Sequence, residues 1–269
     1  MDKDILRILS LKTGLSLNYI SKEEHLSDLL ANLSEILSDQ YVLKGGTALN
    51  RIYLSKMGVN RFSEDLDIDY LSKEPVDTRI RNIKEAMKLV RGFDIKEPRL
   101  MHRTLRFDCR YVNEIGHADV VKVEYYMSHE SADAAENPKK VLISSPYVPG
   151  SPALFNSYSL TDLLAMKLAA LYGRTEGKDM YDLFYGLEAD YDKSKLGKAL
   201  EIQLRFYKID KTREELFEAL SQKLDQAVKK SEYIGNSTNH YIPAKLRPDW
   251  QVFIKTLRRK IEKLMVPST

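Results

Sequence analysis

Two short segments combine the residue types that hold phosphates and metal ions. The first is Lys44–Gly45–Gly46–Thr47, which ends an apolar run and precedes a helical pattern. Backbone N–H groups at a helix N-terminus attract anions, because the helix dipole leaves that end partly positive. A Gly-Gly pair before a helix is also a common tight turn. The segment therefore allows either a phosphate-binding turn or a plain one.

The second segment places carboxylates at alternate positions, Asp65, Asp67 and Asp69. Side chains alternate between the two faces of a strand, so these acids share one face and the apolar residues between them form a core face. Three carboxylates on one face repel each other unless they are solvated, protonated or bridged by a cation. A hard divalent ion is the natural bridge, and Mg²⁺ is the usual one where phosphates complete its shell. A solvated strand edge is the plainer interpretation.

Three familiar motifs do not fit these segments. An EF-hand loop starting at Asp65 would need Gly at its sixth position and Glu at its twelfth, where the chain has Tyr70 and Val76. A P-loop places its lysine after the glycines, and here Lys44 precedes them. A Rossmann fingerprint would need a third glycine after Gly45 and Gly46.

Charged residues in a later helical region supply a second group of candidates. Lys167 lies on the same side as an apolar stripe, so its side chain either snorkels to solvent or reaches a polar cleft. Arg174 is two turns further on, and both cations can point toward one anionic ligand. Asp179 and Asp182 share a helix face. An N-cap or first-turn role is the structural alternative for Asp179.

The composition of the 269-residue chain is that of an ordinary globular protein, with 43% hydrophobic and 30% charged residues. No apolar run is long enough to cross a membrane, and the first residues do not resemble a secretory signal. The single Cys109 excludes an internal disulfide and a cysteine zinc site, so we expect a cytoplasmic protein without membrane association.

The net charge of +3 is too small to indicate nucleic-acid binding. A basic C-terminal end, Arg247 and residues 255–263, fits either a phosphate backbone or the solvated face of a helix.

Hydrophobic periodicity divides the chain into two parts. In residues 1–150 it predicts helices and short strands: helices over 5–11, 26–38, the stretch after Thr47, and 79–90, and strands over 41–43, 66–71, 105–111, 120–126 and 141–143. Residues 144–159 are rich in proline and mark the best boundary. Residues 151–269 read as helices over 160–172, 179–188, 193–207, 212–230 and 249–264. The sequence thus predicts an α+β protein with an N-terminal α/β domain built on a mixed sheet and a C-terminal helical bundle that completes the cleft.

Four separated blocks resemble one known family. They are residues 43–49, 61–67, 164–171 and 178–183, and the match spans about residues 40 to 190. The chain resembles the AbiEii/AbiGii nucleotidyltransferase toxins of the DNA polymerase β-like superfamily. These act in bacterial toxin–antitoxin or abortive-infection systems, and they include the MenT toxins, which add nucleotides to the 3′ end of tRNA.

The resemblance implies a role for each matching residue of the first two blocks. Gly45 and Gly46, helped by Thr47, would hold the triphosphate of a nucleoside triphosphate. Asp65 and Asp67 would coordinate Mg²⁺, with Mn²⁺ as a possible substitute.

In the superfamily a third acid comes from a neighbouring strand, and Glu124 is our choice, with Asp108 and Asp119 as rivals. Lys167 would contact the triphosphate together with Arg174, and Asp179 would complete the catalytic site. Lys178 stands where relatives often have arginine, which keeps the charge and loses the two-pronged hydrogen bonding.

The function that this resemblance implies is Mg²⁺-dependent transfer of a nucleotide to RNA, with the tRNA 3′ end as the expected acceptor and a cognate antitoxin as the expected partner. Transfer to a protein or small molecule is one alternative. A nucleotide-binding or partner-binding module without catalysis is another.

Overall fold

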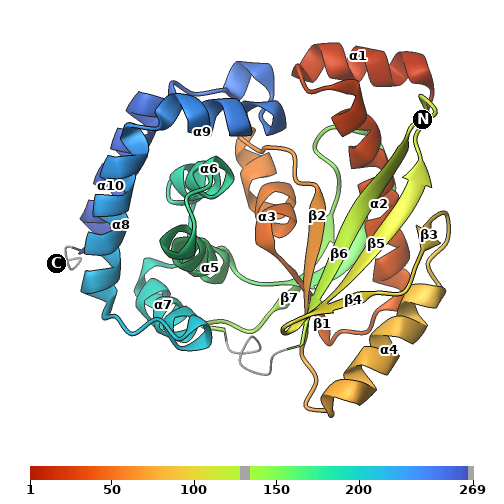
Figure 1. Cartoon of the computed structure of the whole chain (residues 1–269), viewed down its shortest axis with the longest axis horizontal. Helices are drawn as coiled ribbons and strands as arrows, with labels where there is room; N and C mark the ends of the chain where they lie inside the picture. The colour runs from red at the N-terminus through yellow and green to blue at the C-terminus, as the bar shows by residue number, and fades with distance from the viewer. Residues whose placement is uncertain (128–133, 266–269) are drawn as a thin grey trace.

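A computed structural model describes residues 1–127 and 134–265. It confirms the α+β class, because a sheet formed mostly by the first half of the chain is followed by helices (Figure 1). The strands are β1 (Tyr41–Lys44), β2 (Asp65–Tyr70), β3 (Asp94–Ile95), β4 (Arg99–Met101), β5 (Thr104–Val112), β6 (Ala118–Tyr126), β7 (Lys139–Ile143) and β8 (Ala153–Ser157). The helices are α1 (Lys3–Thr13), α2 (Leu17–Ile36), α3 (Gly45–Ala48), α4 (Val76–Lys88), α5 (Leu160–Gly173), α6 (Gly177–Gly186), α7 (Lys193–Tyr207), α8 (Arg213–Val228), α9 (Ser231–Thr238) and α10 (Trp250–Met265).

The sheet is mixed, and its order places the acid-bearing strand β2 near the centre. The strands run β3-β5-β6-β2-β1-β8-β7, with β4 paired to β5. β2 pairs antiparallel with β1 and parallel with β6. In this register Lys44, directly before the glycine pair, lies opposite Asp67, and Asp67 lies opposite Glu124. The turn and the acids are therefore neighbours.

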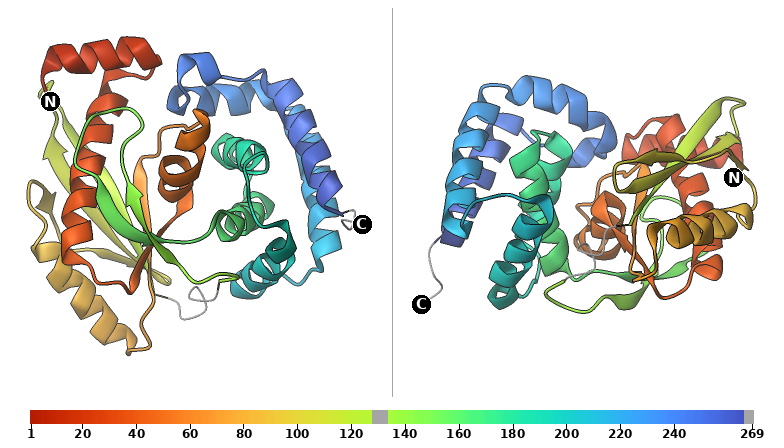
Figure 2. Two further views of the ribbon diagram at one scale, coloured as in Figure 1. Left: turned by 180° about the vertical axis from the view of Figure 1, so that it is seen from behind. Right: turned by 60° about the horizontal axis from the view of Figure 1, so that its bottom comes forward.

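Helices cover both faces of the sheet. α2 and α4 lie on one side, and α3 lies on the other, between the sheet and the C-terminal helices (Figures 1 and 2). α5 packs against α6, α7 and α8, and so forms the centre of the helical half. The predicted alternation of β2 is confirmed, since Leu66, Ile68 and Tyr70 are buried. The two halves thus meet along the face of the sheet that carries the glycine turn.

One local prediction was wrong, and strand β8 was not predicted. The sequence predicted a helix that begins after Thr47, but α3 begins at Gly45 and its N-cap is Lys44. The chain continues as a π-helical segment, Leu49–Tyr53, and a 3₁₀ turn, Leu54–Met57. The proline-rich stretch 144–159 contains strand β8, which pairs parallel with β1. The division of the chain at residue 150 stays a prediction, and the sheet extends beyond it.

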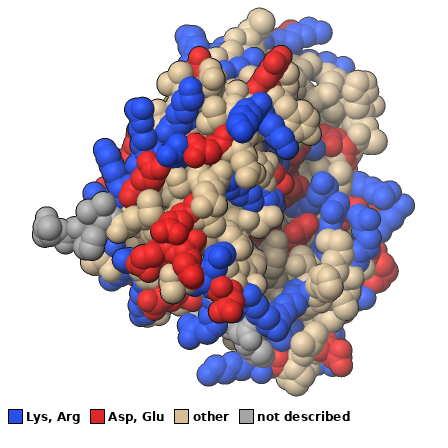
Figure 3. Space-filling view, turned by 60° about the vertical axis from the view of Figure 1, so that its left-hand side comes forward, with Lys and Arg blue, Asp and Glu red and all other residues tan. Residues whose placement is uncertain are grey.

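The basic residues at positions 255–263 belong to α10, whose apolar side is buried, whereas Arg247 precedes this helix. Arg258 pairs with Asp225 and Glu262, and Lys260 pairs with Glu188. Figure 3 shows basic and acidic side chains mixed over this face of the molecule. These pairs favour the solvated-face interpretation. Within residues 1–127 and 134–265, no helix is long and apolar enough to cross a membrane.

Candidate active site

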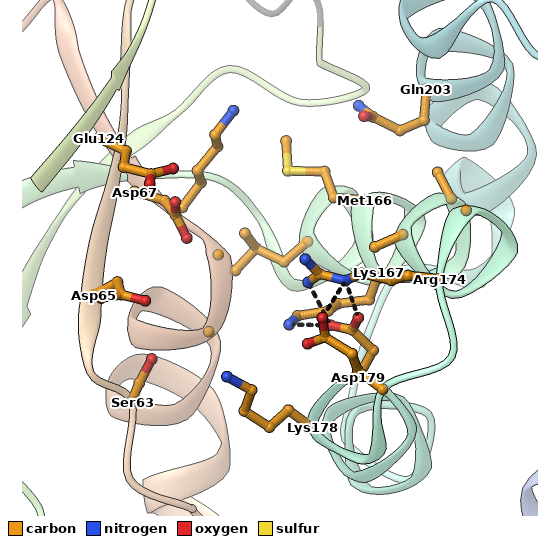
Figure 4. Close-up of a pocket in the computed structure, with 18 of the residues that line it drawn as sticks. Ser63, Asp65, Asp67, Glu124, Met166, Lys167, Arg174, Lys178, Asp179 and Gln203 are labelled. Carbon is orange, nitrogen blue, oxygen red and sulfur yellow. Dashed lines mark hydrogen bonds and ion pairs between the residues drawn. The ribbon is translucent and has the colours of Figure 1, made fainter. Parts of the chain in front are cut away.

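A cavity of about 750 Å³ lies between the sheet and the helical half. Its walls come from the turn after β1, from β2 and β6, and from α5, α6 and α7 (Figure 4). It brings together almost all the residues that the sequence singled out: Gly45, Gly46, Asp65, Asp67, Glu124, Lys167, Arg174 and Asp179. Thr47 is buried and does not line the cavity. Its hydroxyl donates to the carbonyl of Asp65 at 2.6 Å and so fastens the turn to the acid-bearing strand.

Side chains packed against the turn leave no space for a Cβ atom at Gly45 or Gly46. Gly45 has a φ of +70°, and a Cβ there would collide with the Asp67 carboxylate. A Cβ at Gly46 would lie 2.8 Å from Arg61 Nη2 and 2.9 Å from the Ser63 hydroxyl. The backbone of the turn therefore approaches the carboxylate more closely than any other residue type would permit.

Asp65 and Asp67 present carboxylates without a protein partner. Among the described residues, none donates a hydrogen bond to either carboxylate and no cation lies within ion-pair distance. Burial raises the pKa of Asp67 to about 6; the Lys44 ammonium opposes this rise, while Glu124 and Asp65 add to it. Burial likewise raises the pKa of Asp65. Crowded carboxylates of this kind fit a divalent cation that would replace the missing positive charge.

Glu124 stands next to Asp67 on β6, but its carboxylate has other contacts. Its Oε2 accepts a hydrogen bond from the Tyr126 hydroxyl at 3.3 Å, and Arg106 lies 4.0 Å from its Oε1. In the described part of the chain, no three His, Cys, Asp or Glu side chains form a group that could hold a metal ion. Asp65, Asp67 and Glu124 would therefore fill only part of the coordination shell of a metal ion. This suits Mg²⁺, because it keeps several waters and takes oxygens from substrate phosphates.

The rival acids lie outside the cavity and have partners of their own. Asp108 pairs with Arg99 and Arg106 on neighbouring positions of the sheet. Asp119 pairs with Lys22. Of the three acids considered for the third position, only Glu124 lines the cavity within the described residues.

Asp69 has a different environment from the other two acids. It is fully buried, pairs with Lys44 Nζ at 2.6 Å and accepts a hydrogen bond from the Tyr158 hydroxyl at 2.6 Å. Lys44 Nζ also lies 3.6 Å from the centre of the Tyr126 ring. Asp69 is thus not solvated; it anchors Lys44, whose ammonium faces the cavity beside Asp67. Lys44 is part of the motif at residues 43–49, but no sequence pattern predicts that it pairs with Asp69 beside the cavity.

The opposite wall of the cavity is cationic and is held by buried acids. Lys167 Nζ pairs with Asp179 at 2.8 Å and with Asp182 at 2.7 Å, and Arg174 Nε pairs with Asp179 at 2.7 Å. Burial opposes ionisation of Asp179, but the charges of Lys167 and Arg174 outweigh it and keep the pKa of Asp179 well below its usual range. Figure 4 shows this cluster facing Asp65 and Asp67 across the cavity.

Lys167 and Arg174 therefore do converge on one anion, and that anion is Asp179. An ammonium has three N–H donors, so Lys167 keeps one beyond its two carboxylates. The Arg174 side chain is 55% exposed and remains accessible from the cavity. Lys178 also lines the cavity, and no described carboxylate lies within ion-pair distance of its ammonium, which sits 4.7 Å from the Tyr241 ring centre. The family motif included Lys178, but the sequence did not indicate that its ammonium lacks a carboxylate partner.

Arg61 and Asp182 join the two halves of the molecule. Arg61 donates to both oxygens of Asp182, Nε to Oδ1 at 2.9 Å and Nη2 to Oδ2 at 2.6 Å. Asn50 donates to the same Asp182 at 2.9 Å and to the carbonyl of Gly46 at 2.9 Å. Asp182 is fully buried, and the charges of Arg61 and Lys167 lower its pKa against the effect of burial. The sequence indicated that Asp182 shares a face with Asp179, but not that it fixes the glycine turn.

The cavity thus combines an open pair of carboxylates, a glycine turn and a cationic wall, which are groups that suit a phosphate ligand and a divalent cation. The comparison with family models agrees: residues 28–264 match the family described as nucleotidyl transferase AbiEii toxin, type IV toxin–antitoxin system. The chain belongs to this family of nucleotidyltransferase toxins.

Solved structures share the fold at low sequence identity. The nucleotidyltransferase toxin MenT4 from Mycobacterium tuberculosis is 19% identical, with a TM-score of 0.66, over 97% of this chain and 90% of MenT4. JHP933 from Helicobacter pylori is also 19% identical, with a TM-score of 0.53, over 93% of this chain and 95% of that protein. No curated protein matches the sequence.

Proposed function

We propose that the protein transfers a nucleotide from a nucleoside triphosphate to RNA in a Mg²⁺-dependent reaction, with the tRNA 3′ end as the acceptor. The observation that carries this proposal is the pair Asp65 and Asp67, whose carboxylates lack protein partners, with the Asp67 carboxylate lying against Gly45. Membership of a nucleotidyltransferase toxin family supports the reaction type. The resemblance to toxins that modify tRNA supports the acceptor.

Each wall of the cavity has a separate task in this reaction. Asp65 and Asp67, with Glu124 as the proposed third ligand, would hold Mg²⁺, or Mn²⁺ in its place. When bound, the metal supplies charge stabilisation for the attacking 3′-hydroxyl and the leaving pyrophosphate. Phosphate oxygens would bind the backbone of the turn at Gly45 and Gly46, next to the Asp67 carboxylate.

The cationic wall would act on the rest of the triphosphate. Lys167, fixed by Asp179 and Asp182, offers a donor whose position does not depend on the substrate. Arg174 and Lys178 would offset the charge that develops on the β- and γ-phosphates. The main contribution of the protein is therefore alignment and electrostatics, which agrees with a site that contains no cysteine or histidine among its described lining residues.

Labelled nucleotides distinguish this function from its alternatives. Purified protein is incubated with each labelled nucleoside triphosphate, Mg²⁺, and either total RNA or protein from a lysate. We expect label on RNA, and none with Asp67→Ala or with chelator. Asp210→Ala, an exposed aspartate outside the cavity, is the matched control. Label only on protein would refute the RNA acceptor, and label on neither, with intact folding, would favour the non-catalytic binding module.

Sequencing RNA 3′ ends after expression in cells tests the acceptor directly. Wild type is expected to leave added nucleotides on tRNA 3′ ends, and Asp67→Ala is not. Growth inhibition should disappear with Asp65→Ala and Lys167→Ala while both variants stay folded. A cognate antitoxin and a cytoplasmic place of action are part of the same proposal, since the family belongs to toxin–antitoxin systems. Co-expression of the neighbouring gene should restore growth if that gene encodes the antitoxin.

A further inference from the structure

Gln203 is a buried polar residue on the apolar side of α7. Its neighbours on that side, Leu196, Ala199, Leu200 and Leu204, are buried and apolar, so helical spacing predicts an apolar residue at position 203 as well. Gln203 is only 6% exposed. Among the described residues, its amide has no hydrogen-bond partner, and Figure 4 shows it pointing into the cavity.

The described part of the protein leaves this amide unpaired and open to the cavity, where a ligand or water would be its partner. Burying a donor and an acceptor without hydrogen bonds costs about 1–3 kcal/mol, so side chains of this kind are normally satisfied. No cation or carboxylate of the phosphate side of the site contacts the amide. The groups that line the cavity beside it are apolar or aromatic, namely Met166 from α5 and Phe206 and Tyr207 from the end of α7. Their surface suits the flat face of a nucleobase rather than a phosphate.

We propose that Gln203 hydrogen-bonds the base edge of the incoming nucleotide, while Met166 and Phe206 contact the face of the base. This inference rests on the proposed function, because it assumes that the cavity takes a nucleoside triphosphate. The Watson–Crick edge of every base offers a donor next to an acceptor, and the glutamine amide carries the same pair. Because no described residue fixes the amide, it can present its oxygen and nitrogen in either order. Gln203 therefore determines how strongly the base edge is bound, and Met166 and Phe206 determine the size of base that fits.

Binding measurements separate the base from the triphosphate. We would determine dissociation constants for the four nucleoside triphosphates and for inorganic tripolyphosphate, each with Mg²⁺, for wild type and for Gln203→Leu. Leucine keeps the volume and suits the apolar side of α7, so folding should persist. We expect nucleoside triphosphates to bind Gln203→Leu about tenfold more weakly or worse, because a good bidentate contact contributes on that scale. Tripolyphosphate affinity should stay unchanged. Gln222→Leu, at an exposed position of α8, is the matched control and should bind like wild type.

A second variant reports on the base edge itself. In Gln203→Glu both oxygens only accept hydrogen bonds, and guanine is the base that offers two adjacent donors on its Watson–Crick edge. The preference for GTP over the other three nucleotides should rise at least about fivefold. The inference is overturned if Gln203→Leu binds every nucleotide as tightly as wild type does. Failure of wild type to bind tripolyphosphate and all four nucleotides would instead overturn the proposed function and the base site together.

Discussion

Asp67 is the residue whose substitution tests the proposed metal site most directly. Its carboxylate is crowded by Asp65 and Glu124 and is kept close to the turn by the absence of a side chain at Gly45. A protein gains no stability from such an arrangement. The acid is therefore expected to lower the stability of the metal-free fold at neutral pH.

Asp67→Asn should stabilise the metal-free protein at pH 7.5 by about 2 kcal/mol, with a smaller gain at lower pH. The folded-state pKa of about 6 lies above the ordinary 3.8, so the folded protein binds the extra proton between these values. The stability of wild type therefore falls as pH rises from about 4 to 6, and this loss is absent in the asparagine variant. Urea unfolding at pH 4 and 7.5 measures the difference. Mg²⁺ should raise the melting temperature of wild type more than that of Asp67→Asn. An equal stability gain at both pH values, or the same gain in Asp210→Asn, would contradict this account.

Gly45→Ala should abolish the Mg²⁺ response, whereas Gly58→Ala should not. Both glycines have a φ of +70°, so each alanine costs about 1 kcal/mol in backbone strain. Only at Gly45 does the new methyl group also displace the Asp67 carboxylate, since nothing lies within 4 Å of a Cβ at Gly58. Thermal unfolding with and without Mg²⁺ compares the two variants. If both keep the response of wild type, close packing of Asp67 on the turn does not matter for metal binding.

At the scale of elements, the contact between α6 and the turn after β1 depends on the buried pair of Arg61 and Asp182. Asp182→Asn should cost about 3–5 kcal/mol, because it leaves the Arg61 guanidinium and Lys167 short of negative charge in a buried place. Glu85→Gln, which removes the exposed pair with Lys88, should cost less than about 1 kcal/mol. Urea unfolding of both variants provides the measurement. Similar small losses would mean that the buried pair does not join the two halves.

The sequence predicted the parts of the site that depend on local spacing. The period of two in β2 placed Asp65 and Asp67 on one face, and the period of the helix placed Asp179 beside Asp182. The sequence did not predict that Arg61 pairs with Asp182. These residues are 121 positions apart, and their contact depends on how α6 packs against the sheet. The only indication of Gln203 in the sequence was that it is a polar residue within the apolar stripe of a predicted helix. Strand β8 was missed because nearby prolines favour a loop.

At the scale of the whole molecule, the strand order decides where the chain can be divided. A fragment of residues 1–150 lacks β8, which lies between β1 and β7 in the sheet. The edge of β1 would then be unpaired and its apolar side chains uncovered. We expect this fragment to show no cooperative unfolding transition by circular dichroism, in contrast to the full chain. A sharp transition in the fragment would establish residues 1–150 as an independent domain.

The order of the site residues along the chain has a consequence for how such a toxin is made. A ribosome completes β2, with two of the three proposed metal ligands, about a hundred residues before it reaches Lys167, and Gln203 follows later still. The carboxylates cannot meet the cationic wall until α5 and α6 have been synthesised and packed. An unfinished or prematurely terminated product is therefore expected to be harmless to the cell, and toxicity begins only with the nearly complete chain.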